Sequence, residues 1–244
     1  MTPLLEVLDV TKRFGRLKAL DGISFQARPG EIVGLIGPNG AGKSTAQAII
    51  CGELLADRGR VRIAGSEVSA ANMKAHRQVG HVPQRIVLFP FLTANEILAL
   101  AAELSGLTPA AGRERAAKLL DALELSEHSD RLAREYSEGM ARKLAIAVAL
   151  VGAPPLLLLD ESLNGLDPQS SATVQRMIED HAAQGNAVIL TSHLLWTMER
   201  LCTKILLLHQ GRLVDSLDRD ALNGLRTEGR TLEDYYLTTL KSAR

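Results

Sequence analysis

The chain has 244 residues, with 28 basic side chains, 28 acidic side chains and two cysteines. This length suffices for one large or two small domains with a buried core, and the balanced charge argues neither for nor against a nucleic-acid partner. Two cysteines, Cys51 and Cys202, are too few for a disulfide framework or a four-ligand zinc site, residues 1–10 lack a signal-peptide pattern, and no apolar run approaches the roughly 18 residues of a membrane span.

Short strands dominate the first third of the chain. The sequence predicts strands at residues 5–10, 23–27, 31–36, 61–63 and 80–82, and a helix at 43–51. A helical region follows, in which Thr93 and Glu96 form the pattern of a capping box ahead of Ile97, Leu98 and Leu100. Helical periodicity continues at 112–123 and again at 141–151.

After Pro154 and Pro155 the pattern changes to alternating strands and helices. The unbroken aliphatic run at 156–159 is typical of a parallel strand buried on both faces. Asp167-Pro168 is the pattern of an N-cap followed by proline, and this helix is expected to end near residue 184. Strands at 187–191 and 204–209 and an amphipathic helix at 231–240 follow. We therefore predict an α/β core interrupted by a helical insertion at about residues 85–152.

Residues 37–44, Gly-Pro-Asn-Gly-Ala-Gly-Lys-Ser, fit the phosphate-loop pattern GxxxxGK[ST] between a predicted strand and a predicted helix. Glycines let a chain wrap around phosphate, so that its N–H groups point inward at the helix N-terminus. Lys43 would contact the β- and γ-phosphates, and the Ser44 hydroxyl would bind Mg²⁺. The alternative is an ordinary glycine-rich turn that opens a helix.

Two adjacent carboxylates follow the aliphatic strand at 156–159. Asp160 would hold the Mg²⁺ shell, and Glu161 would take a proton from the attacking water. The alternative is a pair of strand-end carboxylates that face solvent. His193 ends another predicted strand, at the sheet edge where ligands bind in open α/β folds. There it could contact a γ-phosphate or orient Glu161, although a lone histidine is more often structural.

Ser137 and Gly139 lie at the start of the helix predicted at 141–151. Ser137 can serve as its N-cap, or the serine, the glycine and the helix N-terminus together can form a second anion site. A long helical insertion separates this site from Lys43. The two sites are therefore not assumed to reach one nucleotide within one chain.

In their order along nearly the whole chain, these motifs resemble those of the ATP-binding cassette (ABC) ATPases. Phe14 in Lys12-Arg13-Phe14-Gly15 is similar to the adenine-stacking aromatic, and Gln84 in His81-Val82-Pro83-Gln84 to the Q-loop glutamine. Singly, these two are better explained as a solvent-side aromatic and a turn residue. Residues 137–140 stand at the signature position, 160–161 at the second carboxylate motif, 164–167 at the D-loop and His193 at the switch histidine.

The resemblance implies a role for each matching residue. The nucleotide-binding residues would be Phe14, Gly37, Pro38, Asn39, Gly40, Ala41, Gly42, Lys43, Ser44, Thr45, Ser137 and Gly139. The catalytic residues would be Lys43, Gln84, Glu161 and His193, and the Mg²⁺ ligands Ser44, Gln84 and Asp160.

The resemblance also implies the fold, a P-loop NTPase (RecA-like) α/β core with an N-terminal antiparallel β subdomain and an inserted helical subdomain. Residues 1–84 and 153–215 would form the core with its β subdomain, residues 85–152 the helical subdomain and residues 216–244 a helical tail.

The same resemblance implies the partners. Two ATPase subunits, identical or different, would close around two ATP molecules with Mg²⁺, and the signature of each would reach the phosphates bound by the other. Separate transmembrane permease subunits would hold the protein at the cytoplasmic face of a membrane, and no nucleic-acid partner is expected. Residues 85–92, with Phe89 and Phe91, would form a groove for a coupling helix of the permease or, equally well, a buried loop core.

The sequence departs from the family pattern at the signature. It reads Tyr136-Ser137-Glu138-Gly139-Met140 where LSGGQ is common, and a carboxylate at Glu138 would repel a triphosphate unless the side chain turns outward. Ser162 stands where proline is usual, which should be a mild change. Residues 164–168 and 231–237 are similar to the export branch, so we expect outward transport.

Two alternative functions remain at this point. The first is a soluble single-cassette ATPase in cofactor assembly. DNA-repair members carry coiled-coil or zinc insertions, for which the 93 positions from Ser44 to Ser137 leave no room, and translation members usually carry two cassettes. The second is a regulatory cassette that binds ATP but hardly hydrolyses it. Glu138 motivates this alternative, whereas the intact Lys43, Glu161 and His193 argue against it.

Overall fold

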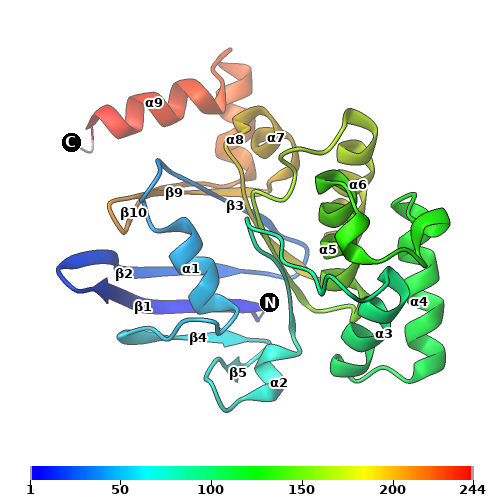
Figure 1. Cartoon of the computed structure of the whole chain (residues 1–244). Coiled ribbons are helices and arrows are strands. Elements are labelled where there is room, and N and C mark those ends of the chain that lie inside the picture. Colours follow the sequence, from blue (N-terminus) through cyan, green and yellow to red (C-terminus); the bar gives the residue numbers. More distant parts are fainter. Residues whose placement is uncertain (1, 243–244) are drawn as a thin grey trace.

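The computed structural model describes residues 2–242, which form two β-sheets and a set of helices (Figure 1). Residues 1 and 243–244, at the ends of the expected core and tail, lie outside the described residues. The strands are β1 (Leu5–Phe14), β2 (Leu17–Ala27), β3 (Ile32–Ile36), β4 (Arg58–Ile63), β5 (Ser66–Glu67), β6 (Val79–Val82), β7 (Leu156–Asp160), β8 (Ala187–Thr191), β9 (Lys204–His209) and β10 (Arg212–Leu217). The α-helices are α1 (Lys43–Ile50), α2 (Met73–His76), α3 (Ala94–Leu104), α4 (Pro109–Ala122), α5 (Glu138–Val151), α6 (Pro168–Ala183), α7 (Leu195–Leu201), α8 (Arg219–Thr227) and α9 (Leu232–Ser242), and 3₁₀ turns lie at Ser126–His128 and Ala133–Glu135.

The larger sheet has six strands in the order β10-β9-β3-β8-β7-β6. Pairing is parallel from β9 to β6, and only β10 runs antiparallel, beside β9. Strands β3, β7 and β8 are buried at every residue, as their aliphatic sequences predict. Because parallel strands end at the same edge, the segments that follow β3, β6, β7 and β8 are brought together there.

Successive side chains along these strands point to opposite faces of the sheet, and each face borders its own hydrophobic core. Val33 and Leu35 face a core that contains α1 and the smaller sheet β2-β1-β4-β5. Ile32 and Ile36 face the opposite core, to which the helices α3 to α9 contribute. Figure 1 shows the consequence: α1 lies near the small sheet, while α3, α4 and α5 gather on the other side of the molecule. The phosphate loop, which joins β3 to α1, is thus anchored in the core between the sheets.

The helical region begins with the predicted capping box. The Thr93 hydroxyl accepts from the Glu96 amide, and the Glu96 carboxylate accepts from the Thr93 amide. Ile97 and Leu98 are buried as expected, whereas Leu100 is 38% exposed, because it lies off the buried face of α3. Helix α5 begins at Glu138, three residues before the predicted start, because Ser137 caps it.

Several elements carry no strong sequence pattern and were not predicted. Strand β10 is mostly exposed, so it lacks an aliphatic run, and it ends two residues beyond the expected tail boundary at 215. The short elements β5, α2, α7 and α8 were also missed. Strand β2 begins at Leu17, six residues before the predicted start, where its side chains are less buried.

Helix α9 has Leu232 and Tyr235 buried, in agreement with the predicted amphipathic face. Across residues 2–242, the structure contains no helix with the length and apolar character of a membrane span.

The packing of β6 against α5 gives a first prediction. A Cβ atom at Gly80 would lie 2.1 Å from the carbonyl oxygen of Ala149, which is backbone and cannot move aside cheaply. Gly80→Ala is therefore expected to lower the free energy of unfolding by about 1–3 kcal/mol in urea denaturation. The matched control is Gly224→Ala, inside α8 with open space around it, which should raise the free energy of unfolding by about 0.5–1 kcal/mol. Equal effects of the two substitutions would contradict the packing.

Candidate active site

The phosphate loop is packed so tightly that two of its glycines are sterically required. A Cβ at Gly37 would lie 2.1 Å from the Leu208 carbonyl oxygen on β9, and one at Gly42 would lie 2.5 Å from the Ala19 carbonyl oxygen on β2. Gly42 also has φ +110°, a backbone conformation that residues with a side chain rarely adopt. The loop is thus held against both sheets where α1 begins.

Lys43, the first residue of α1, turns its largely buried side chain back along the loop. Its ammonium donates to the carbonyl oxygens of Gly37, at 2.7 Å, and Pro38, at 3.1 Å. Burial lowers the pKa of Lys43, while the negative charges of Glu161 and Asp160 act in the opposite direction. Lys43 is therefore electrostatically coupled to both carboxylates at the end of β7.

A pocket of about 470 Å³ lies over the loop. Its lining contains Phe14, Leu17, Ala19, Asn39, Gly40, Gly42, Lys43, Ser44, Thr45, Gln84 and Glu161. Nine of these residues were predicted as site residues, and Leu17 and Ala19 of β2 were not. The Phe14 side chain is 49% exposed, which leaves its ring available for stacking at the pocket mouth. The predicted residues Gly37, Pro38, Ala41, Asp160, His193, Ser137 and Gly139 are outside the described lining.

Three segments meet on the carboxylate of Glu161. The Gln84 amide nitrogen donates to Oε2 at 3.0 Å, and the Asn164 amide donates to the same oxygen at 3.4 Å. The His193 Nε2 lies 2.6 Å from Oε1. Both carboxylate oxygens are thus oriented by neighbours, an arrangement suited to a general base that must be aimed at a water molecule. The sequence predicts Gln84, Glu161 and His193 as catalytic residues, and it places Asn164 only in the D-loop.

The backbone of Glu161 is in the left-handed region, with φ +51°. This conformation costs a non-glycine residue about 1–2 kcal/mol, so neighbouring contacts must hold it. Its amide donates to the Thr191 carbonyl and hydroxyl oxygens, both at 3.1 Å. Its carbonyl accepts from Arg142 Nη1 at 3.2 Å. Because of this backbone turn, the side chains of Glu161 and Asp160 point in different directions.

Asp160 is buried at the end of β7, beside Thr191 in the parallel register with β8. The Thr191 hydroxyl donates to Asp160 Oδ1 at 2.5 Å. Together with the Ser44 hydroxyl and the amide oxygen of Gln84, the Asp160 carboxylate offers the hard oxygen donors that Mg²⁺ prefers. The donor set therefore fits the predicted metal.

Known proteins are similar to this chain in sequence. A family model described as ABC transporter matches residues 20–164. The linearmycin resistance ATP-binding protein LnrL of Bacillus subtilis (strain 168) is 36% identical over 211 residues, which cover 86% of this chain and 68% of that protein. The chain belongs to the ABC transporter family. A Nod factor export ATP-binding protein I of Burkholderia pseudomallei (strain K96243) is 37% identical over 86% of this chain and 69% of its own. This ABC protein thus spans about two thirds of the length of these relatives.

Solved ABC structures have the same fold. One described as the ATP binding subunit of an ABC transporter superimposes with a TM-score of 0.91, at 32% identity, over 97% of this chain and 99% of that one. The ATP-binding cassette MJ0796, in a dimeric post-hydrolysis state bound to ADP and Pi, gives a TM-score of 0.80 at 25% identity, over 88% of this chain and 98% of that one. The predicted fold class is confirmed, and the chain is an ATP-binding ATPase subunit of an ABC transporter.

The ABC signature lies at the start of α5. The Ser137 hydroxyl accepts from the Met140 amide at 3.2 Å, so the N-cap interpretation is confirmed. The Glu138 side chain is 81% exposed and pairs with Arg142 at 3.2 Å. Arg142, which sequence reasoning missed, thereby connects the signature to the carbonyl of Glu161. Only its spacing of four residues from Glu138 could have indicated this pairing.

Thr191 contacts the Asp160 carboxylate and the Glu161 backbone amide, and it gives a second prediction. Thr191→Val removes the hydroxyl from a fully buried position, which leaves Asp160 without its donor. We expect the free energy of unfolding to fall by about 1–3 kcal/mol, and the Mg²⁺ concentration for half-maximal ATPase activity to rise. Thr191→Ser keeps the hydroxyl and should retain wild-type behaviour in both measurements. A valine variant with an unchanged Mg²⁺ dependence would contradict the role of this contact.

Proposed function

We propose that this cassette pairs with a second ABC ATPase subunit, closes around two ATP molecules with Mg²⁺, and drives export through separate permease subunits at the cytoplasmic face of a membrane. The observation that carries the proposal is the carboxylate of Glu161, which Gln84 and His193 orient at the wall of the phosphate-loop pocket. Export is favoured by the names of the relatives, which refer to Nod factor export and linearmycin resistance.

The site residues have different roles in ATP hydrolysis. The phosphate-loop amides and Lys43 hold the triphosphate, and the adenine stacks on Phe14 at the exposed mouth of the pocket. Ser44, Asp160 and Gln84 hold the cation, which when bound neutralises phosphate charge. Glu161 accepts a proton from the attacking water. His193 and Gln84 keep the Glu161 carboxylate aimed toward the γ-phosphate position.

Closure between two subunits explains the position of the signature. Ser137 and Gly139 are outside the pocket of their own chain, so they are available to a nucleotide bound by a partner. The N-terminus of α5, with Ser137 as its cap, provides N–H groups suited to phosphate. The Glu138 carboxylate is turned toward Arg142. This meets the expectation that a carboxylate at position 138 is tolerated near a triphosphate if its side chain turns outward. This geometry favours an active cassette over a regulatory one.

A surface beside the Q-loop supports docking to a permease. We call Val87, Phe89 and Phe91 the apolar ridge; their exposed fractions are 79%, 59% and 71%. Ile86 and Leu88, which alternate with them, pack against the core. The alternative of a buried loop core is therefore wrong for the ridge, because only the alternate residues turn inward. Exposed apolar side chains of this size are typical of an interaction surface.

Glu161→Gln provides the test of catalysis. It keeps the shape of the side chain but removes the base, so steady-state ATPase activity should fall by about 10²–10⁴-fold. With Mg-ATP this variant should also be trapped as a dimer, measured by its mass in solution. The matched control is Glu127→Gln, an exposed position outside the pocket, which should hydrolyse ATP at the wild-type rate. Equal rates for the two variants would overturn the proposal.

Phe89→Ser with Phe91→Ser tests the apolar ridge. Tagged wild-type protein is expected to recover a polytopic membrane protein from detergent-solubilised membranes, and the double variant should lose it because the apolar contact is gone. ATPase activity of the isolated double variant should be unchanged. Leu55→Ser, at a position that is 56% exposed elsewhere on the surface, should still recover the partner. Failure of the wild type to recover any polytopic protein would count against the transporter assembly.

A further inference from the structure

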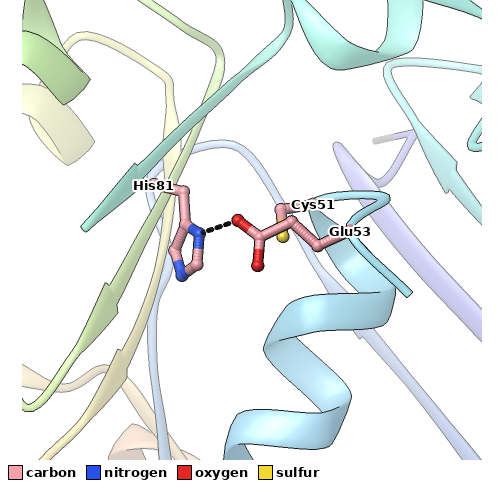
Figure 2. A group of neighbouring side chains, drawn as sticks. All are labelled: Cys51, Glu53 and His81. Carbon is pink, nitrogen blue, oxygen red and sulfur yellow. Dashed lines mark hydrogen bonds and ion pairs between the residues drawn. The ribbon is translucent and has the colours of Figure 1, made fainter. Parts of the chain in front are cut away.

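A cluster of three potential metal ligands lies outside the nucleotide pocket. Cys51 caps the C-terminal end of α1, Glu53 follows it, and His81 lies on β6. Figure 2 shows the three side chains turned toward one another. Their ligand atoms all lie within 4.8 Å of one another, and the described part of the chain holds no second group of this kind.

The spacing is close to that of a coordinated metal. A tetrahedral zinc ion has bonds of about 2.0–2.3 Å to nitrogen, oxygen and sulfur, which places neighbouring ligand atoms about 3.3–3.6 Å apart. His81 Nδ1 and Glu53 Oε1 are already 3.1 Å apart. The Glu53 side chain is 63% exposed and can adjust. The Cys51 thiol, which lies within 4.8 Å of the other two ligand atoms, would approach them by giving up its hydrogen bond to the Ala48 carbonyl oxygen.

The ligand types select the metal. Thiolate and imidazole favour zinc-like ions, whereas Mg²⁺ and Ca²⁺ prefer oxygen donors. Burial raises the pKa of the Cys51 thiol to about 12, so a bound metal must displace its proton. Strongly thiophilic ions can do this.

The surroundings leave room for a fourth, non-protein ligand. The nearby His76 already has both ring nitrogens at backbone carbonyl oxygens, Nδ1 at Cys51 and Nε2 at Ser69. We therefore do not include His76 among the ligands of the cluster. The exposed Glu53 gives the cluster a path to solvent, from which water can complete a four-coordinate site.

We propose that Cys51, Glu53 and His81 bind one thiophilic divalent cation of the zinc type, with water as the fourth ligand. This site is separate from the nucleotide–Mg²⁺ site and from the proposed transport function. The bound ion joins the end of α1 to β6 at His81, which lies three residues before Gln84. The cation therefore stabilises the packing of these two elements against each other.

Cobalt(II) tests the site, because a Co²⁺–thiolate bond gives a charge-transfer absorption that no oxygen or nitrogen ligand produces. Untagged protein, stripped with a chelator and dialysed, is titrated with Co²⁺ and then with Zn²⁺. The expected result is one equivalent of Co²⁺ with a thiolate band that Zn²⁺ displaces. At Zn²⁺ concentrations about 100-fold above Kd, the Tm should rise by about 5–10 °C.

Matched variants locate the ligands. Cys51→Ser should abolish the thiolate band, and His81→Gln and the surface variant Glu53→Gln should each weaken Co²⁺ binding at least about 10-fold. Cys202→Ala, which removes the other thiol, and His193→Ala, which removes a histidine of the active site, should keep the band. The wild type without a band, or Cys51→Ser with one, would overturn the proposal. So would unchanged affinity in Glu53→Gln, a variant whose exposed position keeps folding out of the comparison.

Discussion

Parallel pairing of β6, β7, β8 and β3 is the constraint on which the active site depends. Each strand delivers its functional residue at its carboxyl end, so one register error would separate them. The pairs Val82–Leu159 and Asp160–Thr191 set this register. Because β3, β7 and β8 are buried on both faces, a slip would disturb two cores at once. Hydrophobic packing therefore fixes the distance between Gln84 and Glu161 more firmly than their hydrogen bond does.

Arg142 extends this constraint from the sheet to the helical region. It is 7% exposed, contacts Glu138 at the signature and donates to the carbonyl of Glu161, a residue in a strained backbone conformation. A displacement of α5 relative to the sheet must stretch this contact. The signature of a chain is therefore mechanically linked to Glu161, the proposed base of the same chain. Such a link is one physical route by which binding at one site of a dimer can affect the other site.

The sequence predicted those parts of the molecule whose patterns are local. The aliphatic runs of β3 and β7, the capping box at Thr93 and the phosphate loop were all recognisable along the chain. Strand β10 was missed because its exposed residues form no hydrophobic pattern. Thr191 and Arg142 were missed as site residues because their roles depend on contacts across 30 and 19 positions with Glu161. The convergence of Cys51 with His81 is tertiary in the same sense.

Helix α1 shows how one short element can serve two kinds of cation chemistry. Its eight residues span about 12 Å, with the phosphate loop and the hard donor Ser44 at one end and Cys51 at the other. His81 is the third residue of the four-residue strand β6, three positions before Gln84. A soft cation at the Cys51 end of α1 would thus join the helix that begins at the phosphate loop to the strand that leads to Gln84. Because oxygen donors and a thiol differ in softness, Mg²⁺ and a zinc-like ion would sort between the two ends without competing.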